Sequence, residues 1–337
     1  MNSSGTINIW SRVTDSVTSR FKEEKIYGII AFGSFVRGPC DEFSDIDIAV
    51  IYSGKLILFD KVFVDDVKVD ILGYPIERVE HVLENKNLRG KYRTWYTVCF
   101  WLNLFRNGCI LYDPQRLLMK WKKIAEEWSW SSNELGKVYD MIESNISYLQ
   151  VLYRRKLLME TLISLRDTIS LIIVYQIMKR NNIPSFRPKE LCRMLDTLDD
   201  ETRCLYDDIM GLNCIDNEHV EKALELTSTI MSKKRVWSHY TERAYFDILK
   251  SVKRNNKRLA VLSSRYLALN AIKELLQTSG YDIHLKYFDA RNHLFILDKT
   301  KYFDNEIYET YINLHKLGNL QIHRIRNMIH NISTLEF

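Results

Sequence analysis

The hydrophobic pattern of this chain changes its period once, near residue 115, and this change limits the folds that the chain can adopt. Before that residue, short β-branched runs alternate with helical segments, whereas after it apolar residues recur mostly at spacings of three and four. Asp113-Pro114 lies at this change of period, and its proline interrupts both the strand pattern and the helix pattern. We predict an α/β (α+β) domain with a small mixed sheet over residues 1–115, followed by all-α helical bundles over 116–235 and 236–337.

Short apolar runs bounded by turn residues predict strands over 26–32, 45–52 and 109–112. They also predict a hairpin, whose strands 56–64 and 67–72 turn at Asp65-Asp66. Helical spacing predicts helices over 9–24, 75–85, 116–128, 132–155, 156–180, 217–235, 240–276 with a break, and 304–332. Ser132 is expected to cap one of these helices. Residues 281–299 are mixed, and 294–297 within them are compatible with a short strand or with a helical turn.

A weak self-similarity lies inside the helical part. A long apolar helix pattern that ends near Arg180-Asn181 is echoed about 98 positions later by one that ends near Gln277-Thr278. This echo suggests that the second bundle repeats the first, but any two amphipathic helices look alike. Both a single bundle and a tandem repeat therefore stay open.

Composition excludes several classes of protein. Hydrophobic residues make up 46% of the chain, with only 12 Gly and 5 Pro, which excludes collagen-like and disordered chains. No C-x-x-C pair indicates a zinc or redox site. No signal peptide is visible, and the most apolar run, 169–178, is shorter than a membrane span. We therefore expect a cytoplasmic protein with no membrane partner. Its six cysteines are expected to be reduced and mostly buried: Cys40, Cys99, Cys109, Cys192, Cys204 and Cys214.

Basic residues accumulate in the last third of the chain. Lys plus Arg against Asp plus Glu gives 14 and 14 for 1–112, 16 and 19 for 113–230, and 18 and 10 for 231–337, where six of the eight histidines lie. This bias favours an RNA partner, with a solvated surface as the alternative, and no DNA partner is expected. Five of the basic residues are spaced for a single helical stripe: Lys250, Lys253, Arg254, Lys257 and Arg258.

A Gly-Ser turn follows the first predicted strand. Gly33-Ser34 would expose backbone N–H groups and a hydroxyl to phosphate oxygens, and Arg37 adds positive charge nearby. Asp45 and Asp47 follow on the next strand, two positions apart, so both carboxylates leave the same face. Two like charges held so close favour a divalent cation, and Mg²⁺ suits oxygen ligands together with substrate phosphates.

A third carboxylate, Asp70, lies on the predicted strand 67–72, where Lys68 and Asp70 face the side opposite to the valines. If this strand pairs beside strand 45–52, Asp70 joins the other two aspartates. Three carboxylates can hold two metal ions about 3.5 to 4 Å apart, an arrangement that activates a hydroxyl and stabilises a leaving pyrophosphate. That chemistry is nucleotidyl transfer.

Other residues near these aspartates have simpler explanations. Asp65 and Asp66 compete for the role of third carboxylate, but a hairpin turn already requires such residues. Ser44 is expected to serve in the turn or as a cap. On the helical part, Glu160 could act as a base toward an acceptor, although basic neighbours favour a solvated charge pattern.

Together these residues resemble the signature of the DNA polymerase β-type nucleotidyltransferase superfamily, a Gly-Ser turn followed by Asp-x-Asp. The run looks most like that of the minimal nucleotidyltransferases and the antibiotic nucleotidyltransferases, and the resemblance covers about the first 115 residues. It implies Asp45 and Asp47 as metal ligands and Asp70 as a metal ligand or as the base for the acceptor hydroxyl. It implies triphosphate contacts from Gly33 and Ser34, beside the Arg37 charge, and two Mg²⁺ ions, with Mn²⁺ as the alternative metal.

The same resemblance implies the reaction. A nucleoside monophosphate, expected to be AMP from ATP, is transferred to an acceptor hydroxyl with release of pyrophosphate. Acceptors in the resembling families include proteins, RNA ends and small antibiotics, and the sequence does not choose among them.

The helical part resembles HEPN bundles, in which residues 159–178 would form a wall. Arg324 and His330 resemble the Arg-x(4-6)-His signature of HEPN ribonucleases, although Arg326 is a second candidate partner for the histidine. This implies an alternative function, an RNA-binding or RNA-cleaving toxin–antitoxin module whose nucleotidyltransferase domain is regulatory.

Overall fold

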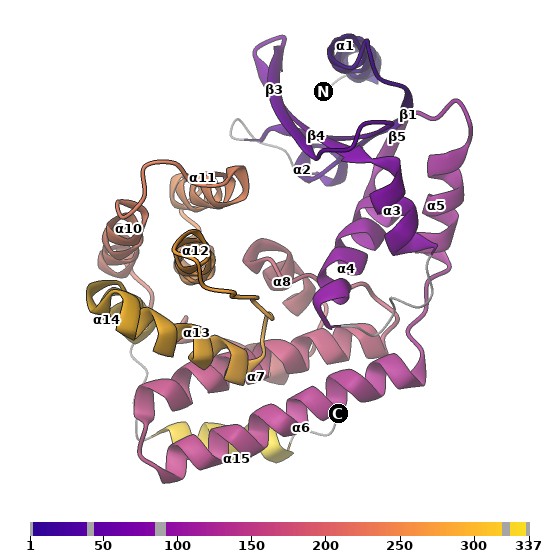
Figure 1. The fold of residues 1–337 in the computed structure, drawn as a ribbon. Coiled ribbons are helices and arrows are strands. Elements are labelled where there is room, and N and C mark those ends of the chain that lie inside the picture. The colour runs from indigo at the N-terminus through magenta and orange to yellow at the C-terminus, as the bar shows by residue number, and fades with distance from the viewer. Residues whose placement is uncertain (1–2, 39–43, 85–91, 319–323, 335–337) are drawn as a thin grey trace. The chain divides into compact units, whose positions relative to one another are not determined.

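The computed structural model describes residues 3–38, 44–84, 92–318 and 324–334 of the chain, which divides into two compact units, Met1–Ser129 and Trp130–Phe337 (Figure 1). The first unit extends beyond the predicted boundary at residue 115 because helix α5 (Leu117–Glu126) packs on strand β1 (Ile26–Phe32). A Cβ on Gly28 of β1 would overlap the Leu118 side chain, so this glycine allows the helix to approach. The predicted boundary at residue 235 does not divide the helices, which form one unit.

The first unit contains the small mixed sheet that the sequence predicts, with five strands in the order β3-β4-β2-β1-β5. Strands β2 and β4 run parallel, and the other neighbours run antiparallel. The predicted hairpin is confirmed, since Val64 pairs with Val67 and the two aspartates between them have φ of 49° and 62°. Two positive φ values are typical of a two-residue hairpin turn. The remaining strands are β2 (Ile46–Tyr52), β3 (Leu58–Val64), β4 (Val67–Pro75) and β5 (Cys109–Tyr112).

Helices cover both faces of the sheet. Val13 and Val17 of helix α1 (Ser3–Arg20) are fully buried against one face, to which Ile46 and Ile48 of β2 also point. Because side chains alternate along a strand, the residues between these isoleucines point to the other face. That face is covered by α5 and by the two helices α3 (Ile76–Leu83) and α4 (Tyr92–Asn107). A short helix, α2 (Ser34–Arg37), follows β1.

The second unit consists of helices in the part of the chain that the structure describes. Residues 294–297, compatible with a short strand or a helical turn from the sequence, lie within helix α13. Ser131 rather than Ser132 caps α6: its hydroxyl accepts from the Glu134 N–H while the Glu134 carboxylate accepts from the Ser131 N–H, a capping box. The helices are α6 (Ser132–Arg154), α7 (Leu158–Lys179), α8 (Pro188–Leu195), α9 (Asp200–Met210), α10 (Asn217–Met231), α11 (His239–Lys253), α12 (Lys257–Thr278), α13 (Ala290–Phe303), α14 (Asn305–Lys316) and α15 (Ile325–Thr334).

The predicted basic stripe on a single helix is wrong. The chain breaks between α11 and α12, where Asn255 has a φ of 52°, so the five basic residues end one helix and begin the next. Arg258, the last of them, forms an ion pair with Asp207 of α9. The charges therefore do not lie along one helix surface.

The two halves of the helical unit correspond in detail. Helices α7 and α12 each have 22 residues, and Arg166 on the first and Arg265 on the second both donate to carbonyl groups near the ends of α9 and α14. Gly211 follows α9 and Gly318 lies shortly after α14, with φ of 68° and 82°, and a Cβ on Gly318 would overlap the Gly211 carbonyl oxygen. Of the two arrangements that the sequence left open, this correspondence favours the tandem repeat over a single bundle.

Helix α7 is long and apolar enough, by length and composition, to cross a membrane, the one such helix among the described residues. However, 89% of its most apolar window is buried inside the protein. Because other helices cover this surface, the pattern is explained by a core helix.

The prediction of mostly buried cysteines is wrong. Among the described cysteines, all of which are free, Cys99 is buried, Cys192 is half-buried, and the rest are exposed: Cys109, Cys204 and Cys214. Cys40 lies outside the described residues.

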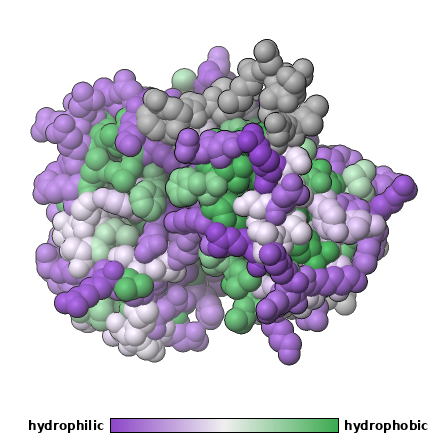
Figure 2. Space-filling model, turned by 90° about the horizontal axis from the view of Figure 1, so that it is seen from above, coloured by the Kyte–Doolittle hydropathy of each residue, from purple (hydrophilic) through white to green (hydrophobic). Residues whose placement is uncertain are grey.

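Hydrophilic side chains cover much of the face drawn in Figure 2, with apolar patches between them. Exposed apolar residues also gather at the edge strand β3, where Leu58 is 40% and Phe63 is 73% exposed. Lys61 lies between these two side chains on the same strand, and a charge on an edge strand opposes pairing with another chain.

Candidate active site

Two of the predicted site residues, Asp47 and Asp70, lie side by side in the sheet. They are direct partners in the parallel pairing of β2 with β4, so their side chains leave the same face. Asp45 precedes Asp47 by two positions, and Lys68 precedes Asp70 by two, which places both on that face as well. The face is the one opposite to α1, because Ile46 and its alternate neighbours fill the α1 core.

Asp47 and Asp70 are buried, and Lys68 contacts Asp70 and the half-buried Asp45. Asp47 is 8% exposed and Asp70 is 3% exposed. The Lys68 ammonium lies 2.8 Å from Asp70 Oδ1 and 3.4 Å from Asp45 Oδ2. Buried carboxylates are costly unless a cation or hydrogen bonds offset their charge, and this ammonium supplies the offset.

The pKa of Lys68 responds to the same surroundings. Burial of the ammonium lowers the pKa, but the hydrogen bond and the charge of Asp70, together with those of Asp45, outweigh burial and raise the pKa above its usual value. Lys68 is therefore a firmly charged member of the site. The alternation of residues 67–71 predicts that Lys68 lies on this face. It does not predict the contacts of Lys68 with Asp70 and Asp45.

The Gly33-Ser34 turn packs directly on Asp47. Phe32, the last residue of β1, pairs with Asp47, so the turn begins beside that carboxylate. Gly33 has a φ of +83° and a ψ of −158°, and a Cβ there would overlap Asp47 Oδ2. Both the backbone conformation and the space available therefore require glycine at this position. Ser34 is 9% exposed and begins the short helix α2.

Arg37 lies at the end of α2, one turn after Gly33. Its backbone N–H donates to the Gly33 carbonyl at 3.3 Å, and its Nε donates to the same oxygen at 3.4 Å. The side chain is exposed. The structure thus places the positive charge of Arg37 at the turn, as the sequence predicts, and the guanidinium is hydrogen-bonded to the backbone of that turn.

The competing carboxylates lie elsewhere. Asp65 sits in the β3–β4 turn and forms an ion pair with Arg12 of α1, and Asp66 occupies the second position of that turn. Both are explained by the hairpin. The structure therefore assembles Gly33, Asp45, Asp47 and Asp70 at one end of the sheet and leaves the turn aspartates outside.

The donor set at this end of the sheet suits a divalent cation. The three side chains offer only carboxylate oxygens, the ligands that Mg²⁺ prefers. Among the described residues, no group of three or more His, Cys, Asp and Glu side chains is already arranged around a metal position. Instead the Lys68 ammonium contacts two of the three carboxylates, so a cation bound here would compete with Lys68 for them.

The residues singled out in the helical unit do not form a comparable site. Arg324 lies before α15 with its Nη2 3.6 Å from Asp208 Oδ2, and its side chain is half exposed. His330 is exposed on α15, and Glu160 is half-buried in the first turn of α7. RNA cleavage by Arg324 and His330 stays a prediction.

Comparison with known proteins gives one family match. Residues 11–98 match the family model of the nucleotidyltransferase domain, which spans β1, β2, the hairpin and the candidate site. A solved structure of a nucleotidyltransferase-like protein from Exiguobacterium sibiricum 255-15 is similar at 13% sequence identity and a TM-score of 0.39, covering 94% of this chain and 91% of that one. No curated protein matches. The predicted nucleotidyltransferase resemblance is thus confirmed for the first unit, and the match gives no support for a HEPN-like helical part.

Proposed function

We propose that this chain, a transferase whose residues 11–98 form a nucleotidyltransferase domain, transfers a nucleoside monophosphate from a Mg²⁺-bound nucleoside triphosphate to an acceptor hydroxyl. ATP is the expected donor, and pyrophosphate is the expected leaving group. The observation that carries the proposal is the pairing of Asp47 with Asp70 across the parallel strands β2 and β4, with the Gly33 turn packed on Asp47. These features bring together carboxylates for metal and a turn for phosphate.

Asp45, Asp47 and Asp70 would hold the divalent metal. When bound, such a cation supplies positive charge to phosphate oxygens and lowers the pKa of a bound hydroxyl. The Gly33-Ser34 backbone N–H groups and the Ser34 hydroxyl donate hydrogen bonds to triphosphate oxygens. Arg37, whose guanidinium lies at the same turn, adds positive charge beside the phosphates that leave as pyrophosphate.

Asp70 is the proposed acceptor of the proton from the attacking hydroxyl. Asp70 is the most buried of the three aspartates. Its side chain is 4% exposed against 15% for Asp45, and the whole residue is 3% exposed against 8% for Asp47. Lys68 is a positioning residue in this proposal, because its ammonium contacts both Asp70 and Asp45 and holds them on the same face.

The reaction is tested with α-³²P-labelled nucleoside triphosphates, Mg²⁺, and protein, RNA or small-molecule acceptors. The expected result is label on one acceptor class with the wild-type chain and no label with the Asp45→Asn, Asp47→Asn double variant. Asp65→Asn is the matched control, since it removes a carboxylate of the same domain from the hairpin turn and should leave transfer unchanged. Equal labelling by all three proteins would refute the proposal.

A further inference from the structure

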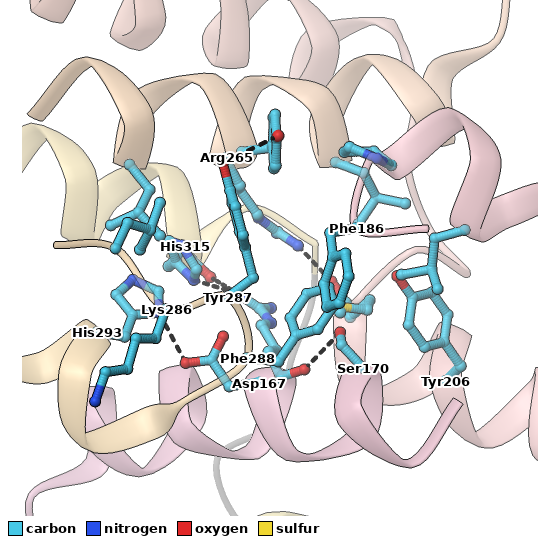
Figure 3. Close-up of a pocket in the computed structure, with 18 of the residues that line it drawn as sticks. Asp167, Ser170, Phe186, Tyr206, Arg265, Lys286, Tyr287, Phe288, His293 and His315 are labelled. Carbon is cyan, nitrogen blue, oxygen red and sulfur yellow. Dashed lines mark hydrogen bonds and ion pairs between the residues drawn. The ribbon is translucent and has the colours of Figure 1, made fainter. Parts of the chain in front are cut away.

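The helical unit contains a pocket between α7 and α12, with an empty volume of about 680 Å³ that includes its open mouth. Figure 3 shows Arg265 on one helix opposite Asp167 and Ser170 on another, with the rings of Tyr287 and Phe288 between them. All of the residues that line the pocket belong to the second unit, so the pocket is independent of the nucleotidyltransferase site.

The two arginines that line this pocket are buried without an acidic partner. Arg166 is 3% and Arg265 is 5% exposed, and neither forms an ion pair with a carboxylate among the described residues. Their donors go to backbone carbonyls: from Arg166 to Ile209 at 3.1 Å and to His315 at 2.7 Å, and from Arg265 to Met210 at 2.7 Å, Leu314 at 3.3 Å and Leu317 at 2.7 Å. Carbonyl dipoles offset only part of two full charges.

The remaining charges of the lining do not supply the missing anion. Lys286 adds a third cation to the lining. Asp167 is the one carboxylate among the lining residues, and its Oδ2 lies 2.8 Å from His293 Nδ1, while His293 Nε2 lies 2.7 Å from the Tyr311 hydroxyl. Since Asp167 is committed to this chain of hydrogen bonds, the lining carries an excess of positive charge.

Two side chains of the pocket also have donors without acceptors. The Arg166 Nη1 lies 3.1 Å from His315 Nδ1, and since a guanidinium only donates, Nδ1 must accept, which places the histidine proton on Nε2. Burial and the neighbouring arginine charges lower the pKa of His315 well below its usual value, consistent with a neutral ring. Both His315 Nε2 and Arg166 Nη2 are buried and have no hydrogen-bond partner.

These orphaned groups favour three acceptor oxygens over two. Arg166 Nη2 carries two N–H bonds and the neutral His315 carries one, so three donors remain unmet. A phosphate monoester presents three terminal oxygens and close to two negative charges at neutral pH, whereas a carboxylate presents two oxygens and one charge. An unmet buried donor is costly, so a ligand that satisfies all three is favoured.

The walls of the pocket are aromatic. Phe186 and Phe288 stack with centroids 5.6 Å apart and planes inclined by 27°, and Tyr266 and Tyr287 stack with centroids 5.5 Å apart and planes inclined by 15°. Aromatic faces pack well on a flat ring, and they give affinity without a particular hydrogen-bond pattern.

We infer that this pocket binds a phosphate monoester carried on a flat ring system, for which a nucleoside monophosphate is the simplest example. The phosphate meets Arg166 and His315, and the ring packs against the cluster of aromatic side chains, in which Phe186 and Tyr287 also contact each other.

The inference is tested by isothermal titration of AMP into the full-length Asp45→Asn, Asp47→Asn variant in EDTA, which removes metal-dependent binding at the first unit. One AMP is expected per chain, while adenosine, inorganic phosphate and benzoate are expected to bind at least about tenfold more weakly, since each lacks the phosphate, the ring or the third oxygen. Arg166→Met is expected to weaken AMP by about thirtyfold, because it removes charge-assisted hydrogen bonds.

Because Arg166 also holds the ends of two helices, a surface variant keeps the test decisive if Arg166→Met does not fold. Lys286→Glu changes an exposed residue of the lining and is expected to weaken AMP by about fivefold at low salt, whereas Lys301→Glu, on exposed α13 surface outside the lining, is expected to have no effect. No AMP binding, equal binding by the Lys286 and Lys301 variants, or tighter binding of benzoate than of AMP would each overturn the inference.

Discussion

Replacing Gly33 with alanine should remove nucleotidyl transfer while leaving the chain folded. The residue has a φ of +83° and a ψ of −158°, a region that only glycine occupies readily, so alanine costs about 1–3 kcal/mol of backbone strain. The new Cβ would also lie 3.1 Å from Asp47 Cγ and would overlap Oδ2. Normal packing between these atoms requires the carboxylate to move by about 1 Å.

A displacement of this size should cost about 100-fold in the rate of transfer, because reacting groups tolerate little misplacement. Gly38→Ala is the matched control. Gly38 ends the same short helix with a φ of +58°, and a Cβ there would meet no atom of the described residues within 4 Å. It should therefore carry a similar strain and leave the carboxylate in place.

The assay combines denaturant unfolding with the initial rate of transfer from α-³²P-ATP. Both variants should lose a comparable free energy of unfolding, and only Gly33→Ala should lose activity. If the two variants transferred label at the same rate, the argument that the turn positions Asp47 would be refuted.

Three further predictions concern other parts of the chain. Lys68→Met should lower the free energy of unfolding by about 1 kcal/mol at neutral pH. Because the pKa of Lys68 is raised in the folded state, this difference is present below the usual lysine pKa and should vanish as the pH rises through the raised value. Urea unfolding at pH 7 and above pH 11 measures the difference, and a difference that grows with pH would contradict the prediction. Gly318→Ala should destabilise the helical unit by more than about 3 kcal/mol, since its Cβ would meet the Gly211 backbone. Gly280→Ala is the control: its φ is +90°, but a Cβ there meets no described atom within 4 Å, so it should cost about 1–2 kcal/mol. Equal melting temperatures of the two variants by circular dichroism would contradict the prediction. The RNA-cleaving alternative requires that His330→Ala abolish cleavage of labelled cell RNA without changing transfer, and unchanged cleavage in that variant would exclude it.

The sequence predicts the first unit well because its signals are local. Each strand is bounded by turn residues, and the hairpin is set by Asp65-Asp66, two neighbours that tolerate positive φ. The relation of Asp47 to Asp70 depends on strand order, yet the alternation in 67–71 already placed Asp70 on the correct face. The contact of Lys68 with two carboxylates could not be read from alternation, because it requires the register of β2 with β4.

The second unit is harder to predict because its features join residues far apart in the chain. Arg166 meets carbonyls of α9 and α14, and the pocket forms only when α7, α12 and the 285–288 segment come together. The position of the break at Asn255 could not be predicted, because the helical spacing of the sequence continues across it. The first unit continues past residue 115 because Leu118 packs against Gly28, a contact that hydrophobic periodicity does not indicate.

The central claim is that Asp70 acts together with Asp47 in the reaction. It is tested most directly by the initial rate of Mg²⁺-dependent pyrophosphate release from ATP, with the acceptor that becomes labelled, for Asp70→Asn and Asp65→Asn. The two substitutions are chemically identical and lie on the same hairpin, but only Asp70 faces Asp47. If Asp70 accepts the proton of the attacking hydroxyl, the rate falls at least about 100-fold for Asp70→Asn and is unchanged for Asp65→Asn. Similar rates for the two variants would contradict it.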